Sequence, residues 1–242
     1  MDSSREDQYR ELLFRHLGDR PEGEIAFFVN GSRFDVLRRT LGDKLAGKSV
    51  LNLGCGPFAL EFYVGPDCAR IDSIDIDPLD ALHADMVGQG LIAPSSFRQA
   101  DVMTFEPERT YDVIIINDVL YSKYVDFPRV VAKYAACLKP GGHFYFDVLD
   151  HRAGPIWAIV NNDARYRRYR IAEVTRVLGQ HGMRIEAQEP SFGIKGGVDR
   201  LARKALWTLA RVSNNVIFLA RKSAVAASAL LVLMMPPFDS LF

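Results

Sequence analysis

A glycine turn and a set of polar residues spaced along the chain are the features best suited to bind a ligand. Gly54, Cys55 and Gly56 directly follow an apolar run at residues 50–53 that contains Asn52. Because glycine has no side chain, a ligand can approach the backbone closely at such a turn. An apolar run that ends in glycine is typical of a buried strand that leads into a helix.

Acidic and amide side chains follow three further apolar runs. Asp75 ends the second run about twenty residues after the turn, and a carboxylate there can accept hydrogen bonds from both hydroxyls of a ribose. Asp77, two residues further on, is the alternative for the same role. Asp101 with Val102, and then Asn117, follow at the spacing of two more strands.

These side chains need a sheet that presents its strand ends at one edge. Apolar periodicity predicts strands alternating with helices from residue 47 to 222, and this alternation requires a parallel sheet covered on both faces. In such a sheet, ligands bind beyond the carboxyl ends of the strands, where the strand order reverses. The predicted strands are 49–53, 70–75, 96–99, 111–117, 143–149, 183–189 and 215–220, and the predicted helices are 59–64, 81–89, 128–138, 155–160, 170–181 and 198–211.

Helical segments precede this core, and an apolar tail follows it. Residues 1–46 are expected to form an N-terminal helical lid, with helices at 9–17, 25–29 and 34–41 that lie across the top of the sheet. The apolar part of the tail, residues 223–242, is about a dozen residues long, whereas a helix needs roughly 20 to span a bilayer. We expect the tail to pack on the domain or on a second copy of the chain in a homodimer.

The ordered set of glycine turn, acidic strand end, Asp101 and Asn117, closed by a Lys-Pro-Gly-Gly stretch at 139–142, resembles the class I S-adenosylmethionine-dependent methyltransferases. The resemblance covers 47–222 and implies a Rossmann-like, doubly wound α/β fold with a seven-stranded, mostly parallel sheet and an antiparallel last strand. It implies S-adenosyl-L-methionine as the cofactor. The chain departs from the family pattern at Asn52, where an acidic residue is common, and at Phe58, where a third glycine is common.

The resemblance also implies a role for each residue of the cofactor site. The backbone of the turn would approach the methionine part, Asp75 would bind the ribose, and Asn117 would lie near the sulfonium. Ile76 would cover one adenine face, Asp101 would accept from the adenine amino group, and the Val102 amide would donate to a ring nitrogen. The implied cofactor-binding set is Asn52, Gly54, Cys55, Gly56, Asp75, Ile76, Asp101, Val102 and Asn117.

The acceptor side offers three candidate catalytic residues. Asp118 and Tyr121 follow the fourth predicted strand and His151 follows the fifth, so each could act as a general base for an acceptor that holds its proton near neutral pH. The acidic-acidic-histidine cluster with which some small-molecule O-methyltransferases bind a divalent metal is missing here, so no metal site is expected. The aromatic and basic stretch 157–169 suits a flat or anionic small molecule.

Composition sets the remaining expectations. The chain has 242 residues, of which 48% are hydrophobic and 25% charged, and its formal net charge is zero. Acids are in excess over 1–150 and bases over 151–242, but no motif for nucleic-acid recognition accompanies the basic part, so a nucleic-acid partner is not expected. Scattered cysteines and a polar N-terminus without a signal peptide indicate a cytoplasmic protein with no transmembrane segment.

The sequence leaves two other functions open. A nicotinamide-dependent oxidoreductase shares this layout, but its Gly-x-Gly-x-x-Gly pattern differs from the Gly-Cys-Gly-Pro-Phe found here. A non-catalytic S-adenosylmethionine-binding scaffold would bind the cofactor without turning over an acceptor. The preferred interpretation is a methyltransferase that acts on an oxygen or nitrogen atom of a small molecule, in specialised biosynthesis.

Overall fold

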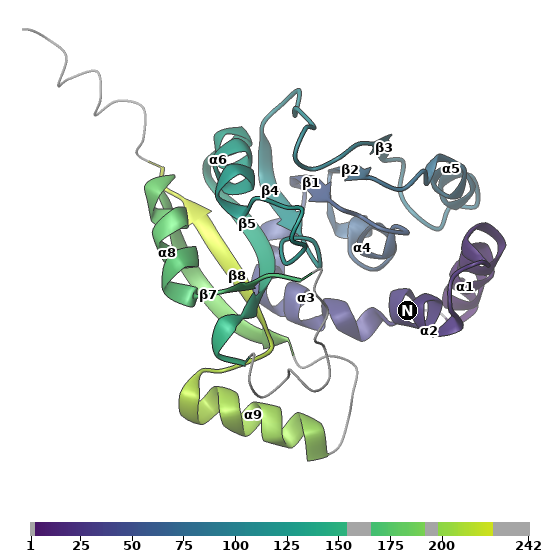
Figure 1. The fold of residues 1–242 in the computed structure, drawn as a ribbon. Helices are drawn as coiled ribbons and strands as arrows, with labels where there is room; N and C mark the ends of the chain where they lie inside the picture. Colours follow the sequence, from purple (N-terminus) through teal and green to yellow (C-terminus); the bar gives the residue numbers. More distant parts are fainter. Residues whose placement is uncertain (1–2, 154–165, 192–197, 225–242) are drawn as a thin grey trace, which may run out of the picture.

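The computed structural model describes residues 3–153, 166–191 and 198–224, and its centre is one mixed sheet (Figure 1). The strand order is β3-β2-β1-β4-β5-β8-β7, and the two-residue strand β6 (Arg168–Tyr169) pairs with β5 beside this path. Strand β8 runs antiparallel to both of its neighbours, and the other pairs are parallel. The other strands are β1 (Ser49–Leu53), β2 (Arg70–Asp75), β3 (Ser96–Gln99), β4 (Tyr111–Ile116), β5 (Leu138–Asp150), β7 (Met183–Ser191) and β8 (Asn215–Lys222).

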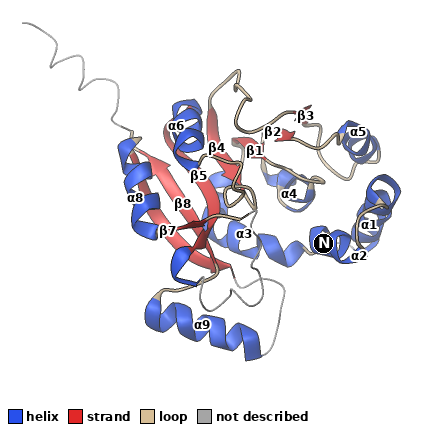
Figure 2. Cartoon of the chain, in the orientation of Figure 1, coloured by secondary structure: helices blue, strands red, loops and turns tan. Residues whose placement is uncertain are grey.

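Helices cover both faces of the sheet (Figure 2). Successive side chains of a strand point to opposite faces, so Val113 and Ile115 of β4 join one buried cluster while Ile114 and Ile116 join the other. The first cluster contains the N-terminal helices with α4 and α5, and the second contains α6 and α8. The helices are α1 (Ser3–Leu17), α2 (Glu22–Phe28), α3 (Asp35–Leu41), α4 (Ala59–Tyr63), α5 (Asp80–Gly88), α6 (Phe127–Cys137), α8 (Ile171–Gln180) and α9 (Val198–Ala210).

The N-terminal helix α1 is anchored to the sheet domain next to the glycine turn. The buried Tyr9 ring stacks on Phe62 of α4 with ring centroids 4.6 Å apart, and its hydroxyl donates to the Pro57 carbonyl at 2.8 Å. His16 Nε2 lies 2.7 Å from Asp85 Oδ2 of α5. Helix α1 therefore packs within one helical layer, and it is α2 and the turn after it that reach the strand ends.

The predicted fold is confirmed, with differences at the ends of elements. Strand β5 begins at Leu138 rather than at residue 143, because Leu138 already pairs with Tyr111 and a register shift then absorbs the glycines. The very short β6 was not predicted. The predicted helix at 155–160 and most of the apolar tail lie outside the described residues.

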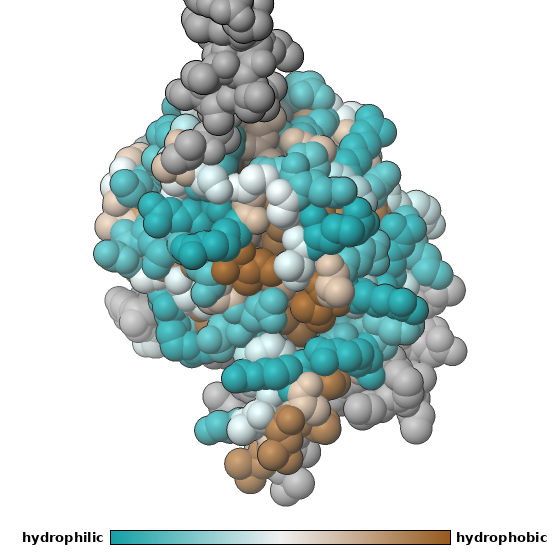
Figure 3. Space-filling view, turned by 90° about the vertical axis from the view of Figure 1, so that its left-hand side faces the viewer, coloured by the Kyte–Doolittle hydropathy of each residue, from teal (hydrophilic) through white to brown (hydrophobic). Residues whose placement is uncertain are grey.

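Helix α9 leaves apolar side chains on the surface. Leu201 and Leu209 are 68% and 86% exposed, whereas Trp207 is buried against the sheet domain. Figure 3 shows apolar surface at the lower end of the molecule, where α9 lies. Within the described ranges, no helix combines the length and the apolar character needed to cross a bilayer.

Candidate functional site

A cavity of about 740 Å³ lies at the carboxyl ends of β1, β2 and β4. Strand order reverses between β1 and β4, which is where open α/β sheets bind ligands, and the volume is in the range of small-molecule sites. The described residues that line it are Phe27, Phe28, Phe34, Asn52, Gly54, Cys55, Gly56, Ala59, Leu60, Asp75, Ile76, Ala100, Asp101, Val102, Met103, Asn117, Asp118, Val119, Tyr121, Ser122, Tyr124, Val125 and Tyr166.

The glycine turn forms one wall, and its conformation requires glycine. Gly54 has φ +71°, and a Cβ there would lie 2.3 Å from Val119 Cγ2, closer than atoms can approach. The amides of Gly54 and Cys55 both donate to the Ile74 carbonyl at 2.9 Å, which ties the turn to β2. The turn therefore exposes main-chain atoms to the cavity, because its two glycines have no side chains.

Phe58 occupies the position where the resembling family commonly has a third glycine. It has φ +62°, the left-handed conformation that glycine adopts readily, and its ring is completely buried. The ring contacts His83 and Phe97, with centroids 5.1 and 5.2 Å away. Packing of this ring under the turn thus compensates for the backbone strain at Phe58.

Asp75 and Asp77 have separate roles. Asp75 lines the cavity, and its two carboxylate oxygens accept from the Gly56 amide at 2.7 Å and the Asp77 amide at 3.0 Å. Each oxygen retains a lone pair for a further donor. Asp77 instead binds Arg20 at 2.5 Å, outside the cavity lining. Of the two, Asp75 is placed to accept from ligand hydroxyls.

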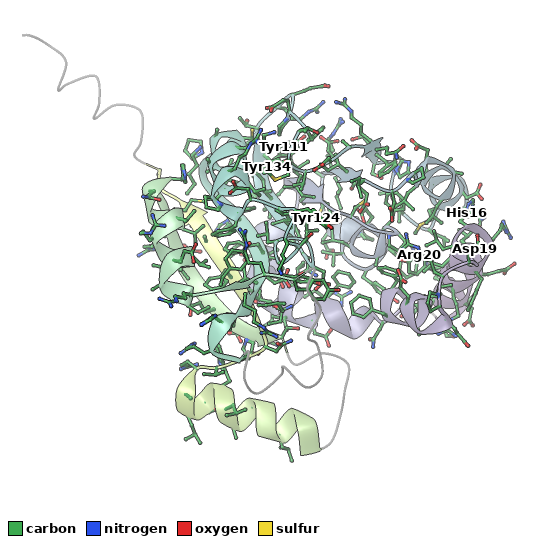
Figure 4. All side chains as sticks on the ribbon, viewed as in Figure 1. His16, Asp19, Arg20, Tyr111, Tyr124 and Tyr134 are labelled. Carbon is green, nitrogen blue, oxygen red and sulfur yellow. The ribbon has the colours of Figure 1, made fainter. Side chains whose placement is uncertain are left out.

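Ile76, Asp101 and Val102 also line the cavity. Ile76 is 66% exposed, although it is a large apolar residue, and it belongs to the cavity lining. Asp101 Oδ1 accepts from the Met103 amide at 2.7 Å, so this side chain also stabilises a turn. Tyr134 of α6, labelled in Figure 4, donates to the Val102 carbonyl at 2.8 Å and holds that peptide in place. Sequence reasoning missed Tyr134, which has only the pattern of a core residue.

Asn52 lines the cavity beside a carboxyl group that sequence reasoning also missed. Its amide nitrogen donates to Glu61 Oε1 at 2.8 Å, and the Ser73 hydroxyl donates to the same oxygen. Glu61 is 1% exposed, and burial raises the pKa of its carboxyl group. The signal for Glu61 was a charged residue within the apolar start of α4.

Asp118 and Tyr121 contact each other in the lining of the cavity. The Tyr121 hydroxyl donates to Asp118 Oδ1 at 3.1 Å, and the Asn117 amide donates to Asp118 Oδ2 at 3.1 Å. Asp118 has φ +60°, a conformation held by its own amide, which donates to the buried Asp147 at 2.7 Å. Burial, followed by the charge of Asp118, raises the pKa of Tyr121 far above its usual value, so its hydroxyl stays protonated.

His151 is not brought to this group. It is exposed in the short helix η4 (His151–Ala153) and does not belong to the described lining. Its neighbours Asp150 and Arg152 form an ion pair, with Arg152 Nη2 2.9 Å from Asp150 Oδ2. The proposal that His151 is a base therefore gains no support from its position.

The electrostatics of the lining favour a cationic ligand. Asp75, Asp101 and Asp118 contribute carboxylates, and no lysine, arginine or histidine belongs to the lining as far as the chain is described. Burial, with the charges of Glu61 and Asp75, raises the pKa of Cys55 well above its usual value, so its thiol is neutral and unreactive. Among the described residues, no group of histidine, cysteine and acidic side chains could hold a metal ion.

Comparison with known proteins places the chain in a family. Residues 26–196 match the methyltransferase domain family, and the chain belongs to it. Ubiquinone biosynthesis O-methyltransferases are similar: that of Vibrio parahaemolyticus is 33% identical over 115 residues, which is 45% of this chain and 46% of that protein. That of Ralstonia nicotianae is 26% identical over 163 residues, 66% of each. The matches thus span about half to two thirds of these curated relatives.

Solved structures share the fold at low sequence identity. N-methyltransferase NodS from Bradyrhizobium japonicum, in complex with S-adenosyl-L-homocysteine, has a TM-score of 0.57 and 18% identity, and the match covers 81% of this chain and 87% of that one. Magnesium protoporphyrin IX methyltransferase from Synechocystis, with the same compound bound, has a TM-score of 0.61 and 16% identity, and the coverage is 91% and 95%. The family uses S-adenosylmethionine as its methyl donor.

Proposed function

We propose that this protein transfers a methyl group from S-adenosylmethionine to an oxygen or nitrogen atom of an aromatic small molecule. The observation that supports this best is the combination found in one cavity. A glycine turn, Asp75 and the Asp101–Val102 segment line it together, and its described charges are all negative. These groups together fit a ligand with a ribose, an adenine and a cationic centre.

The residues at the cofactor end of the cavity bind S-adenosylmethionine and orient it. Asp75 accepts from the ribose hydroxyls while it holds the turn through Gly56. Ile76 covers the adenine, Asp101 accepts from its amino group and Val102 donates to a ring nitrogen. Asn117 and the turn lie along the methionine part. When bound, S-adenosylmethionine supplies a methyl group on an electrophilic sulfonium.

The acceptor end is aromatic. Phe27 and Phe28 of α2, Tyr124 before α6 and Tyr166 before β6 line it, and the Tyr166 ring meets the Tyr121 ring edge-on at 5.2 Å between centroids. Such walls suit a flat ring. The sequence allowed an anionic acceptor as well, but the acidic lining of the described part favours a neutral or cationic one.

Asp118 and Tyr121 are the residues we propose for proton transfer. An acceptor hydroxyl or amine donates to the Tyr121 hydroxyl oxygen, and the proton of Tyr121 passes to Asp118 Oδ1, with which it is already hydrogen-bonded. Tyr121 ends protonated as it began, and the net proton is on Asp118. The raised pKa of Tyr121 keeps it in the state that this relay needs.

Other features complete the proposal. We assign residues 1–46 to a helical part that supplies one wall of the acceptor end, 47–222 to the methyltransferase domain and 223–242 to an apolar tail.

Cys55, Cys68 and Cys137 are free thiols, which supports a reducing compartment such as the cytoplasm. A homodimer through the tail remains a prediction of the sequence.

The experiment that tests this function uses S-adenosylmethionine labelled in its methyl group. The protein is incubated with it and with a panel of phenols, aromatic amines and aromatic carboxylates, and labelled products are identified. We expect label in phenols or amines and little in carboxylates. Tight cofactor binding without label in any acceptor would favour a scaffold, and binding of NAD instead would favour an oxidoreductase.

A further inference from the structure

Glu61 is a buried carboxyl group that the proposed reaction does not use. It lies in α4 directly behind the glycine turn and is 1% exposed. Its Oε1 accepts from Asn52 and Ser73, whereas its Oε2 is buried without a hydrogen-bond partner in the described part of the chain. An unpartnered buried oxygen of this kind is costly, and a buried polar group without a partner calls for an explanation.

The bond to Glu61 determines how Asn52 faces the cavity. Glu61 Oε1 is the acceptor in this pair, so the amide nitrogen of Asn52 is the atom that points to Glu61. The amide oxygen is then left as the group that Asn52 can offer to a ligand, and Asn52 lines the cavity next to Gly54. An amide free to rotate could offer its nitrogen instead, which would repel a cation.

We propose that Glu61 is a positioning residue for the ammonium group of the methionine part of S-adenosylmethionine, acting through the amide of Asn52. The inference rests on the proposed function, because it takes S-adenosylmethionine as the ligand. The ammonium donates to Asn52 Oδ1, while the carboxylate of Glu61 holds and polarises the amide from behind. The negative charge that an acid on β1 would supply comes here from α4.

A purely structural role explains Glu61 less well. Its surroundings are the packed side chains of α4 and the sheet, where an apolar residue of similar size would avoid the desolvation of a carboxyl group and of its unpartnered Oε2. Ser73 also donates its hydroxyl to Glu61, so two neighbouring strands converge on this one oxygen. This arrangement is what is needed to hold an amide in one orientation.

The test compares two ligands on the full chain by calorimetry. S-adenosylhomocysteine has the ammonium group, and 5′-methylthioadenosine lacks the whole amino-acid part. We expect Glu61→Gln to weaken S-adenosylhomocysteine roughly tenfold, because a charge-assisted interaction is lost, and to change 5′-methylthioadenosine by less than about twofold. Asp112→Asn, which removes a carboxylate at the opposite ends of the strands, is the matched control and should change neither.

A double variant makes the test decisive. Asn52→Asp with Glu61→Gln returns the carboxylate to β1, so S-adenosylhomocysteine affinity should recover to within about threefold of the unmodified chain. Equal weakening of both ligands by Glu61→Gln, or no recovery in the double variant, would overturn the proposal. If Glu61→Gln does not fold but the double variant does, the double variant decides: a ratio of the two affinities within about threefold of that of the unmodified chain supports the proposal, and a larger change overturns it. Failure of the unmodified chain to bind either ligand would instead reject the proposed function.

Discussion

Phe58 combines a strained backbone with a buried ring, and its two effects can be separated by mutation. A non-glycine residue in the left-handed conformation costs about 1–2 kcal/mol. We predict that Phe58→Ala lowers the free energy of unfolding by about 3–5 kcal/mol, since it removes the ring but keeps the strain. Phe58→Gly should lose about 1 kcal/mol less, because it relieves the strain. Chemical denaturation of both variants checks this order, and an alanine variant at least as stable as the glycine variant would contradict it.

Asp75 and Asp77 differ by two positions and by their partners. We predict that Asp75→Ala weakens S-adenosylhomocysteine by roughly 1.5–3 kcal/mol, because it removes charged hydrogen bonds to the ribose and the support of Gly56. Asp77→Ala removes an ion pair with Arg20, in which the Arg20 side chain is 33% exposed and the Asp77 side chain 43% exposed. Such a pair contributes little, so the binding free energy of S-adenosylhomocysteine should fall by less than about 1 kcal/mol. Calorimetric losses of equal size in the two variants would remove Asp75 from the site.

Activity measurements can separate Tyr121, which we propose for proton transfer, from His151, the alternative base that the sequence suggested. We predict that Tyr121→Phe lowers kcat by about a hundredfold or more while cofactor affinity stays unchanged, because the relay to Asp118 is broken. Since burial raises the pKa of Tyr121, its titration should produce no loss of activity on the alkaline side up to about pH 10. His151→Ala, on the exposed η4, should leave kcat nearly unaltered, and the reverse pattern would exchange the roles of the two residues.

Among the elements, Asp112 of β4 links the amino ends of three strands, β1, β4 and β5. Its carboxylate accepts from Ser49 of β1 and lies 2.8 Å from the Lys139 ammonium of β5. Burial alone would raise the pKa of Asp112, but the bonds from Lys139 and Ser49 outweigh it and lower the pKa from 3.8 to about 2. The stabilisation is therefore complete above about pH 4 and is lost as the pH falls toward 2.

The matching variant shows the size of this contribution. We predict that Asp112→Asn lowers stability by about 1 kcal/mol at pH 7, a value reduced because Lys139 is 41% exposed. The difference from the unmodified chain should disappear as the pH falls through the range 4 to 2, as followed by urea denaturation at several pH values. A difference that stays constant across this range would show that the ion pair contributes nothing.

The elements themselves were largely predictable, whereas some site residues were not. Strands β1, β2 and β3 begin and end where the sequence predicts, because apolar runs and turn residues determine them locally. The early start of β5 depends on its pairing with Tyr111, a contact distant in sequence. Tyr134 also contacts the site through a residue distant in sequence, Val102, and has no local motif. Glu61 contacts Asn52 of another element only nine positions away, and its one local signal is a charge within the apolar start of α4.

At the scale of the whole molecule, helices pack on both faces of the sheet, and the carboxyl ends of β1, β2 and β4 border the acidic and aromatic cavity. The N-terminal helices contribute to one layer through Tyr9 and to the cavity through Phe27 and Phe28. The same fold carries many functions, so we propose that the chemistry of the cavity, with its turn, Asp75 and Asp101, selects S-adenosylmethionine among nucleotide cofactors.

Calorimetric titration of the full chain with S-adenosylhomocysteine and, separately, with NAD tests this claim most directly. We predict saturable binding of S-adenosylhomocysteine with one site per chain and no heat of binding for NAD. Thermal unfolding in the same samples should show a stabilisation of about 2.7 kcal/mol when S-adenosylhomocysteine is present at 100 times its Kd. Saturable binding of NAD together with no binding of S-adenosylhomocysteine would contradict the account.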